Sequence, residues 1–342
     1  MAAHGPGRPG CPDAELRRAG SIPAVSYGIT VPFQGVALAE HRSWYEELSE
    51  LGYSDLWSSE ADGTDAFTPL ALAAAWVPDL RLGTAIVPSF TRGPALLAQS
   101  VAALAEAAPR RFALGIGTSS GVIVEAWNDL RFERPYERTR DMVEFLRMAL
   151  RGERVDEQFE TFGVRGFRLA RPPAEVPPIL VAALRPGMLR LAGRVGDGAI
   201  VNWLGADDVP RVVAEIGAER EVVARIFVCP SEDAGAVRAQ ARRLLAGYLT
   251  VPVYAAFHDW LGRGEQLAGL WERWRDGDRR AAAAAIPDEV VDALVVHGSA
   301  DEVRARVARY VANGVTTPVL AVLPFAGVDQ REAIRQLAPV AA

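Results

Sequence analysis

Cysteine and histidine are scarce in this sequence, and their scarcity excludes several kinds of protein. The two cysteines, Cys11 and Cys229, lie in a Gly- and Pro-rich head and in a strand-like run, too few for a disulfide framework. The four histidines show no His-x-x-x-His or Glu-x-x-His spacing, so carboxylates would have to hold a metal almost alone. We therefore predict no metal site and, since free thiols suit a reducing compartment, a cytoplasmic protein.

Long apolar runs and basic clusters are also missing. No uninterrupted apolar stretch reaches the roughly 18 residues of a membrane-spanning helix, so we expect no membrane partner. The formal net charge is −6, and Arg residues form no stripe that would neutralise the phosphates of a duplex, so we expect no nucleic-acid partner. Residues 1–22 are rich in Gly, Pro and Arg and lack the apolar core of a secretory signal, which predicts a disordered head.

What the chain does contain is an alternation of short β-branched runs with longer helical stretches, the pattern of βα units around a parallel sheet. We expect eight strands, at 24–31, 53–57, 80–88, 111–118, 177–184, 198–203, 222–229 and 317–324. Eight such units predict an α/β fold, a TIM (β/α)8 barrel forming a single domain over residues 23–342. A two-strand insert is expected near 157–169 and a helical insertion, about 247–296, after the seventh strand. The tryptophans of that insertion, at helical spacing, are expected to pack its helices on the barrel wall.

In such a barrel the active site is built from loops that follow the C-terminal ends of the strands. The segment GIGTSSG at 115–121 occupies one of these ends, but its third glycine comes one place late for a dinucleotide motif and no helix pattern follows directly. Its glycines still allow a ligand close to the backbone, so Gly117, Thr118 and Ser119 are candidates for binding a phosphate or a ring carbonyl. The alternative is a tight turn that holds no ligand.

A second anion-binding candidate lies where the fifth strand meets the next helix, in AALRPGMLRLAGR. Pro186 suits the first helical position and leaves the amides of Gly187 and Met188 free at a helix N-terminus, which attracts phosphate. Arg185 adds a guanidinium at the same point. The alternative is an arginine that merely faces solvent.

Carboxylates follow the second strand in the segment SSEADGTD. Asp65 is placed to cap the helix that starts near Ala66, which leaves Glu60 as the candidate catalytic acid or base and Asp62 as its competitor. Near these strand ends we expect a substrate pocket lined by Phe33, Trp57, Asp62, Trp127 and Trp203.

Taken in order, the motifs LGY-DLW, DAFTPLALAAAW, LRLGTAIVP, RGPALLA, RFALGIGTSS and PPILVAALRPGMLRLAGRVGDGAIVNW carry a family resemblance. Over about 27–217 and 295–324 the sequence is similar to luciferase-like oxidoreductases that use the deazaflavin coenzyme F420. The resemblance implies a deazaflavin across the barrel mouth, near Ser59 and the third and fourth strands, with its phosphate at the Arg185 loop. It also implies a non-proline cis peptide in the third strand, matching the bond between Ala85 and Ile86.

One departure from the family bears on the reaction. Sugar-phosphate dehydrogenases of this family have Asp-His where this chain has Ser59-Glu60, so Glu60 would have to be the proton-transfer group. The resemblance leaves open the direction of hydride transfer and the small-molecule substrate. An FMN-dependent monooxygenase on the same barrel is the alternative enzyme, and a non-catalytic flavin-binding barrel would follow if Glu60 were paired away from the mouth. The oligomeric state is also open, with a homodimer as one possibility.

Overall fold

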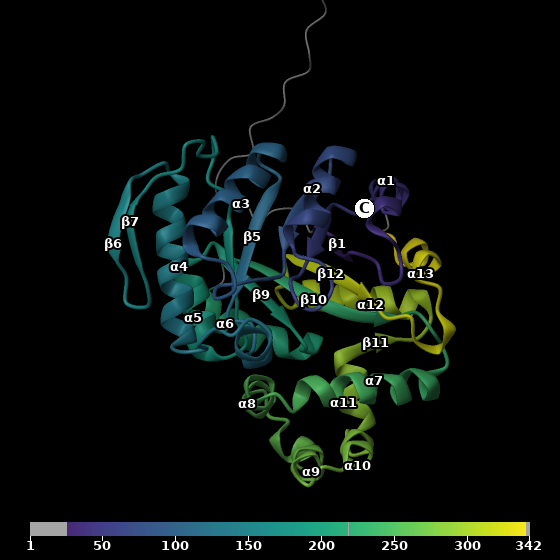
Figure 1. Ribbon diagram of the computed structural model, residues 1–342. Helices are drawn as coiled ribbons and strands as arrows, with labels where there is room; N and C mark the ends of the chain where they lie inside the picture. The colour runs from purple at the N-terminus through teal and green to yellow at the C-terminus, as the bar shows by residue number, and fades with distance from the viewer. Residues whose placement is uncertain (1–25, 218, 340–342) are drawn as a thin grey trace, which may run out of the picture.

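The computed structural model describes residues 26–217 and 219–339, and its centre is a closed barrel of parallel strands (Figure 1). Each barrel strand pairs with the next and the last pairs with the first, in the order β1 (Gly28–Val31), β2 (Asp55–Ser58), β3 (Arg81–Thr84), β5 (Phe112–Gly117), β8 (Ile179–Ala182), β9 (Gly198–Asn202), β10 (Glu221–Cys229) and β12 (Thr317–Val322). The predicted TIM barrel is confirmed. The predicted head, residues 1–22, lies outside the described residues.

Helices follow the strands and surround the barrel (Figure 1). Pro186 starts a helix at its first turn, as predicted, and Pro94 does the same in another helix. Gly52, with a φ of 85°, follows the end of a third helix. The helices next to the barrel are α1 (Arg42–Glu50), α2 (Phe67–Trp76), α3 (Pro94–Ala107), α4 (Pro135–Leu150), α5 (Pro186–Val195), α6 (Val209–Ile216), α12 (Ala300–Ala312) and α13 (Gln330–Gln336).

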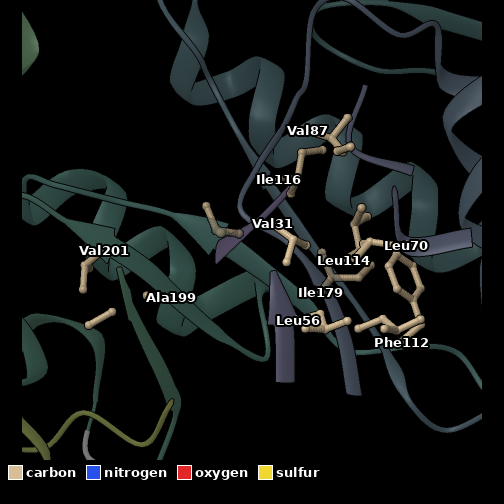
Figure 2. Packing of buried hydrophobic residues seen from close by; sticks show 14 of the residues in the cluster. Val31, Leu56, Leu70, Val87, Phe112, Leu114, Ile116, Ile179, Ala199 and Val201 are labelled. Atoms are coloured by element: carbon tan, nitrogen blue, oxygen red, sulfur yellow. The ribbon is translucent and has the colours of Figure 1, made fainter. Parts of the chain in front are cut away.

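The main hydrophobic core lies between the outer face of the barrel and these helices. Because side chains alternate across a strand, Leu56, Leu114 and Ile179 point outward, where they pack with the helix residue Leu70 (Figure 2). The same alternation turns the other residues of each strand into the barrel interior. The inward residues therefore decide what lies beneath the mouth.

One large side chain, Trp57, fills the middle of the interior. It packs with Ala113, Leu180, Ile200, Val223 and Val319, and its side chain is buried. Glycines make room for the indole on both sides: a Cβ at Gly83 would lie 2.3 Å from two of its ring carbons, and one at Gly28 would lie 2.9 Å from its Cδ1. The middle layer of the interior is thus packed around Trp57.

Below Trp57, at the N-terminal end of the strands, the interior holds a paired charge cluster. Arg81 donates to both carboxylate oxygens of Glu221, at 2.6 and 2.9 Å, and lies 3.4 Å from Asp55. Burial raises the pKa of Asp55 despite the attraction of Arg81. The charges at this end of the barrel are therefore satisfied within the protein.

The third strand is interrupted near its C-terminal end. β3 stops at Thr84, and β4 (Val87–Pro88) resumes pairing with β5. Between them the Ala85–Ile86 peptide is cis, which confirms the prediction. The amide of Ala85 donates to the carbonyl of Ser58 at 2.5 Å, and the amide of Glu60 donates to the carbonyl of Ile86 at 3.1 Å. Backbone hydrogen bonds thus join this interruption to the end of β2.

Two insertions decorate the barrel. β6 (Val155–Gln158) and β7 (Gly163–Phe167) form the expected two-stranded insert, which is antiparallel. β10 is followed by α7 (Ala234–Leu249) and then by the expected helical insertion, whose helices gather on one side of the barrel (Figure 1): α8 (Pro252–Trp260), α9 (Gly264–Arg275), α10 (Arg279–Ala284) and α11 (Asp288–Leu294). No helix among the described residues is long and apolar enough to cross a membrane.

The helical insertion ends in a strand that the sequence did not predict. β11 (Val295–His297) pairs with the last residues of β10, beyond the point where β9 stops pairing with it. A run of three residues is too short to show strand periodicity, which explains why the helical insertion was expected to extend to residue 296. Trp271 and Trp274 pack in the core of this insertion and Trp260 packs on the main core, as expected.

Replacing Gly83 with alanine should destabilise the fold, because the new methyl group would overlap the Trp57 indole. Overpacking of this kind costs about 1–3 kcal/mol, measurable as a lower free energy of unfolding in urea. Gly247→Ala is the matched control, since its Cβ would meet no atom within 4 Å and alanine favours its position inside α7. Equal stability of Gly83→Ala and the wild-type protein would contradict this packing.

His258, in α8, should make the fold sensitive to acid. Its side chain is buried, neither ring nitrogen has a hydrogen-bond partner among the described residues, and burial together with the charge of Arg263 lowers its pKa from 6.5 to about 3. The unfolded chain therefore binds a proton near pH 6.5 that the folded chain does not, and stability falls as the pH drops below that value.

Between about pH 7.5 and about pH 5, His258 alone should remove about 2 kcal/mol from the free energy of unfolding. Urea unfolding of the wild-type protein and His258→Leu at both pH values measures this contribution. The variant should lose less stability over that range by about the same amount. An identical loss in both proteins would show that His258 does not remain neutral in the fold.

Candidate active site

The mouth of the barrel, at the C-terminal ends of the strands, has a wall of small side chains. Ala85, Ile86 and Ala182 are partly exposed and pack on the Trp57 cluster below them. Gly117 is buried beside them, and a Cβ there would lie 2.7 Å from that of Ala182. A wall of glycine, alanine and one isoleucine carries short side chains, so a flat ring could lie against it.

The segments that follow β5 and β9 border this wall. The loop after β5 presents Thr118 and Ser119, both partly exposed, and Ser119 has a φ of 62°. Trp203, directly after β9, has a φ of 52°. Non-glycine residues in this left-handed region are uncommon and collect at functional sites, which agrees with a site at these strand ends.

The N-terminus of α5 opens on the same edge, because β8, which precedes it, pairs with β5. The first backbone hydrogen bond of the helix runs from Leu189 to the carbonyl of Arg185, so the amides of Gly187 and Met188 have no partner within the helix. Arg185 and Gly187 are exposed, and no atom lies within 4 Å of the position of a Cβ at Gly187. The helix end and the guanidinium can together hold an anion.

Glu60 lies on the other side of the small-residue wall and is paired with an arginine. Arg92 Nε lies 3.2 Å from each carboxylate oxygen of Glu60, and Arg92 Nη2 lies 3.0 Å from Oε2. The amide of Ala66 also donates to Oε2, at 3.3 Å. The side chain keeps 18% of its exposure, and its backbone holds the interruption of the third strand, so Glu60 is paired at the mouth and not behind the barrel.

Arg92 was missed by the sequence reasoning, although it is the first residue of the motif RGPALLA. Its guanidinium also stacks over Phe67, 4.9 Å from the ring centroid. Pairing between positions 60 and 92 depends on the barrel bringing two neighbouring loops together. The sequence motif shows that Arg92 is present, but only the folded structure shows that it pairs with Glu60.

The other two carboxylates of this loop have different surroundings. Asp65 accepts hydrogen bonds from the amides of Phe67 at 2.9 Å and Thr68 at 3.0 Å, which confirms its expected role as a helix cap. Burial alone would raise the pKa of Asp65, but hydrogen bonds from Thr68 and Phe67 lower it. Asp62 is exposed on the loop. Ser59, partly exposed, precedes Glu60 at the end of β2.

The aromatic residues predicted to line a substrate pocket are placed differently from one another. Trp127 is 54% exposed, just beyond the short helical segment η2 (Val122–Ala126) that follows the β5 loop. Phe33, Trp57 and Trp203 are all buried, so none of the three presents surface to a substrate, contrary to the prediction. Phe33 stacks on His41 and Trp44 in the outer core, and Trp57 points into the barrel centre. Trp203 is buried and stacks on Phe227, with ring centroids 3.6 Å apart.

Comparison with known proteins agrees with this arrangement. Residues 23–317 match the model of the luciferase-like monooxygenase family. The chain belongs to this family. It is 28% identical over 315 residues, 82% of this chain and 90% of the relative, to a protein of Mycobacterium tuberculosis named as a candidate coenzyme F420-dependent oxidoreductase. A 5,10-methylenetetrahydromethanopterin reductase of Archaeoglobus fulgidus is 25% identical over 309 residues, 85% of this chain and 92% of the relative.

Solved structures of this luciferase-like fold include enzymes with different cofactors. The coenzyme F420-dependent tetrahydromethanopterin reductase from Methanopyrus kandleri superposes with a TM-score of 0.74 and 21% identity, covering 92% of this chain and 98% of that chain. Monooxygenases also match, one of them in complex with FMN. At such identity the likeness establishes the fold, and the cofactor has to be argued from the site.

Proposed function

We propose that this luciferase-like protein is an F420-dependent oxidoreductase that transfers a hydride between the deazaflavin and a small organic substrate at the barrel mouth. The observation that carries the proposal is the position of a free helix N-terminus next to a wall of small side chains. A flat tricycle with a phosphate on its side arm needs these two features side by side. The Mycobacterium tuberculosis relative named for coenzyme F420, which matches 82% of this chain, supports the deazaflavin in particular.

One group of residues at the mouth would contact the ring of the coenzyme, and another would hold its phosphate. Ala85, Ile86 and Gly117 would lie against the ring, with Ser59, Thr118 and Ser119 as hydrogen-bonding groups at its edges. Arg185 and the amides of Gly187 and Met188 would hold the phosphate. The bound coenzyme supplies or accepts the hydride, and the protein supplies position and electrostatics.

Glu60 is the group we assign to proton transfer. Hydride transfer to or from an uncharged reacting group has to be matched by a proton. The Glu60 carboxylate lies beside the wall and accepts from one backbone amide, that of Ala66, whereas Asp65 accepts from two amides of α2. Arg92 fixes the orientation of the carboxylate through paired hydrogen bonds. Asp62, exposed on the same loop, is the competing group.

An FMN-dependent monooxygenase is the second candidate, because FMN is also a flat tricycle with a phosphate and a matching fold binds it. The experiment that tests the proposal is a substrate screen with oxidised and with reduced F420, read as the change in coenzyme absorbance. Turnover with F420 supports it. Oxygen consumption with reduced FMN, in the absence of any F420 turnover, would favour the monooxygenase. Binding of either cofactor with no turnover in either screen would favour a non-catalytic barrel.

Arg185→Ala should weaken the binding of F420, because it removes a charge-assisted hydrogen bond to the phosphate. The expected loss is about 1–3 kcal/mol in binding free energy, measured by fluorescence titration. Arg190→Ala is the matched control on the same helix, since Arg190 is 61% exposed and pairs with Glu215 at 2.6 Å. If the two variants bind F420 equally well, the phosphate does not lie at Arg185.

Glu60→Gln should separate catalysis from binding. The amide keeps the shape and much of the hydrogen bonding of the carboxylate but does not titrate, so turnover should fall by about 10²–10⁴-fold while F420 affinity stays within about twofold. Asp62→Asn is the matched control and should keep most of the activity. A loss below about threefold in Glu60→Gln, with a large loss in Asp62→Asn, would move the role to Asp62.

A further inference from the structure

Besides Arg81, the barrel interior contains a second arginine, Arg225, which lies at the level of the mouth. It is the fifth residue of β10, where inward positions alternate from Glu221 in the lower charge cluster through Val223 in the Trp57 cluster. Phe227, the next inward residue toward the C-terminal end of β10, stacks on its guanidinium, 5.0 Å from Cζ to the ring centroid. In sheet register Arg225 is opposite Asn202 of β9 and Val319 of β12.

Arg225 has no anionic partner in the described part of the chain. No Asp or Glu of residues 26–217 and 219–339 forms an ion pair with it, and its Nε is buried without a hydrogen-bond acceptor. Burial lowers the pKa of Arg225. The nearby Tyr248 and Tyr254 act in the opposite direction and raise it. The Arg225 side chain as a whole is partly exposed, so a ligand can reach the guanidinium and supply the opposite charge.

The surroundings of Arg225 would suit a flat, carboxylate-bearing molecule. Asn202 and Tyr254 hydrogen-bond to each other, with the amide nitrogen 3.3 Å from the hydroxyl. Tyr248 is 37% exposed and packs edge to face on Tyr254, 5.8 Å between centroids. The site therefore combines a guanidinium, an amide, phenolic hydroxyls and an exposed aromatic ring, with no acidic side chain among the partners that face Arg225.

We propose that Arg225 binds a carboxylate of the substrate, through its Nε and one Nη in side-on bidentate geometry, with Asn202 and Tyr254 as neighbouring polar contacts. This deepens the proposed function, on which it rests: it restricts the substrate of the enzyme to anionic molecules with an unsaturated or aromatic body. The Nε hydrogen is the donor that lacks an acceptor, and a carboxylate that accepts from Nε and Nη satisfies it.

The order of strands in the barrel places this site across from the coenzyme wall. Around the ring of strands β1, β2, β3, β5, β8, β9, β10 and β12, β10 stands four places from β3, which is the opposite side. Ala85 and Ile86 follow β3, and Arg185 follows β8. A molecule held by Arg225 would thus lie over the mouth between the aromatic side and the ring, as a hydride donor or acceptor must.

The test uses benzoate as the probe and benzamide as its uncharged isostere, added to the full-length protein without coenzyme. Binding is measured by calorimetry and by tryptophan fluorescence, because Trp203 stacks on the Phe227 ring, which in turn contacts Arg225. The wild-type protein should bind benzoate at least about tenfold more tightly than benzamide, and Arg225→Met should abolish the preference. The control Arg171→Met, at a side chain that is 78% exposed, should keep it.

Three results would overturn the assignment. They are equal binding of benzoate and benzamide to the wild-type protein, an unchanged preference in Arg225→Met, or a loss of F420 affinity of about tenfold or more in that variant. The last would show that Arg225 holds an acidic group of the coenzyme instead of the substrate. Failure of the wild-type protein to bind F420 would contradict the proposed function but leave the benzoate result intact.

A second variant keeps the test decisive if Arg225→Met does not fold, as judged by its thermal unfolding. Arg225→Lys preserves the charge but not the fork of donors, so it should prefer benzoate with an affinity lower than that of the wild-type protein. Loss of the benzoate preference in a folded Arg225→Lys, with wild-type stability, would contradict a charge-based site.

Discussion

The packing of Trp57 inside the barrel is the constraint on which the rest of the site depends. The interior of a parallel barrel of eight strands has to be filled by side chains. Here the Trp57 indole fills the middle layer, and Gly28 and Gly83 leave room for it because they have no Cβ. The positions above it on β3, β5 and β8 can then be small. Ala85, Gly117 and Ala182 accordingly present short side chains at the mouth, against which a flat ring could lie.

The barrel interior contains two arginines, Arg81 near the N-terminal ends of the strands and Arg225 near their C-terminal ends, and they have different surroundings. Arg81, at the N-terminal end, is paired with Glu221 and has Asp55 beside it, so it completes the structure by itself. Arg225, two inward positions above Glu221 on the same strand, has no such partner in the described chain. Stability explains the first arrangement, and binding of an anion explains the second.

Sequence reasoning could predict what depends on local patterns. Strand runs, the proline at the start of α5 and the cap at Asp65 follow from neighbours a few residues away, and the structure confirms them. The direction of side chains near a strand end is harder to predict, so Phe33, Trp57 and Trp203 were placed in the pocket although all three are buried in packed cores. Pairs such as Glu60 with Arg92 depend on tertiary contacts that a single sequence does not contain. A charge inside the apolar run VVARIFVC was the available signal for Arg225.

The central claim is that the mouth of this barrel is built for a deazaflavin. Its most direct test is a competition titration of the full-length protein, in which F420 and FMN are measured against each other at equal ionic strength by fluorescence anisotropy. The account predicts one saturable F420 site per chain and an affinity for F420 at least about tenfold higher than for FMN, a difference of about 1.4 kcal/mol. An equal or higher affinity for FMN would contradict it.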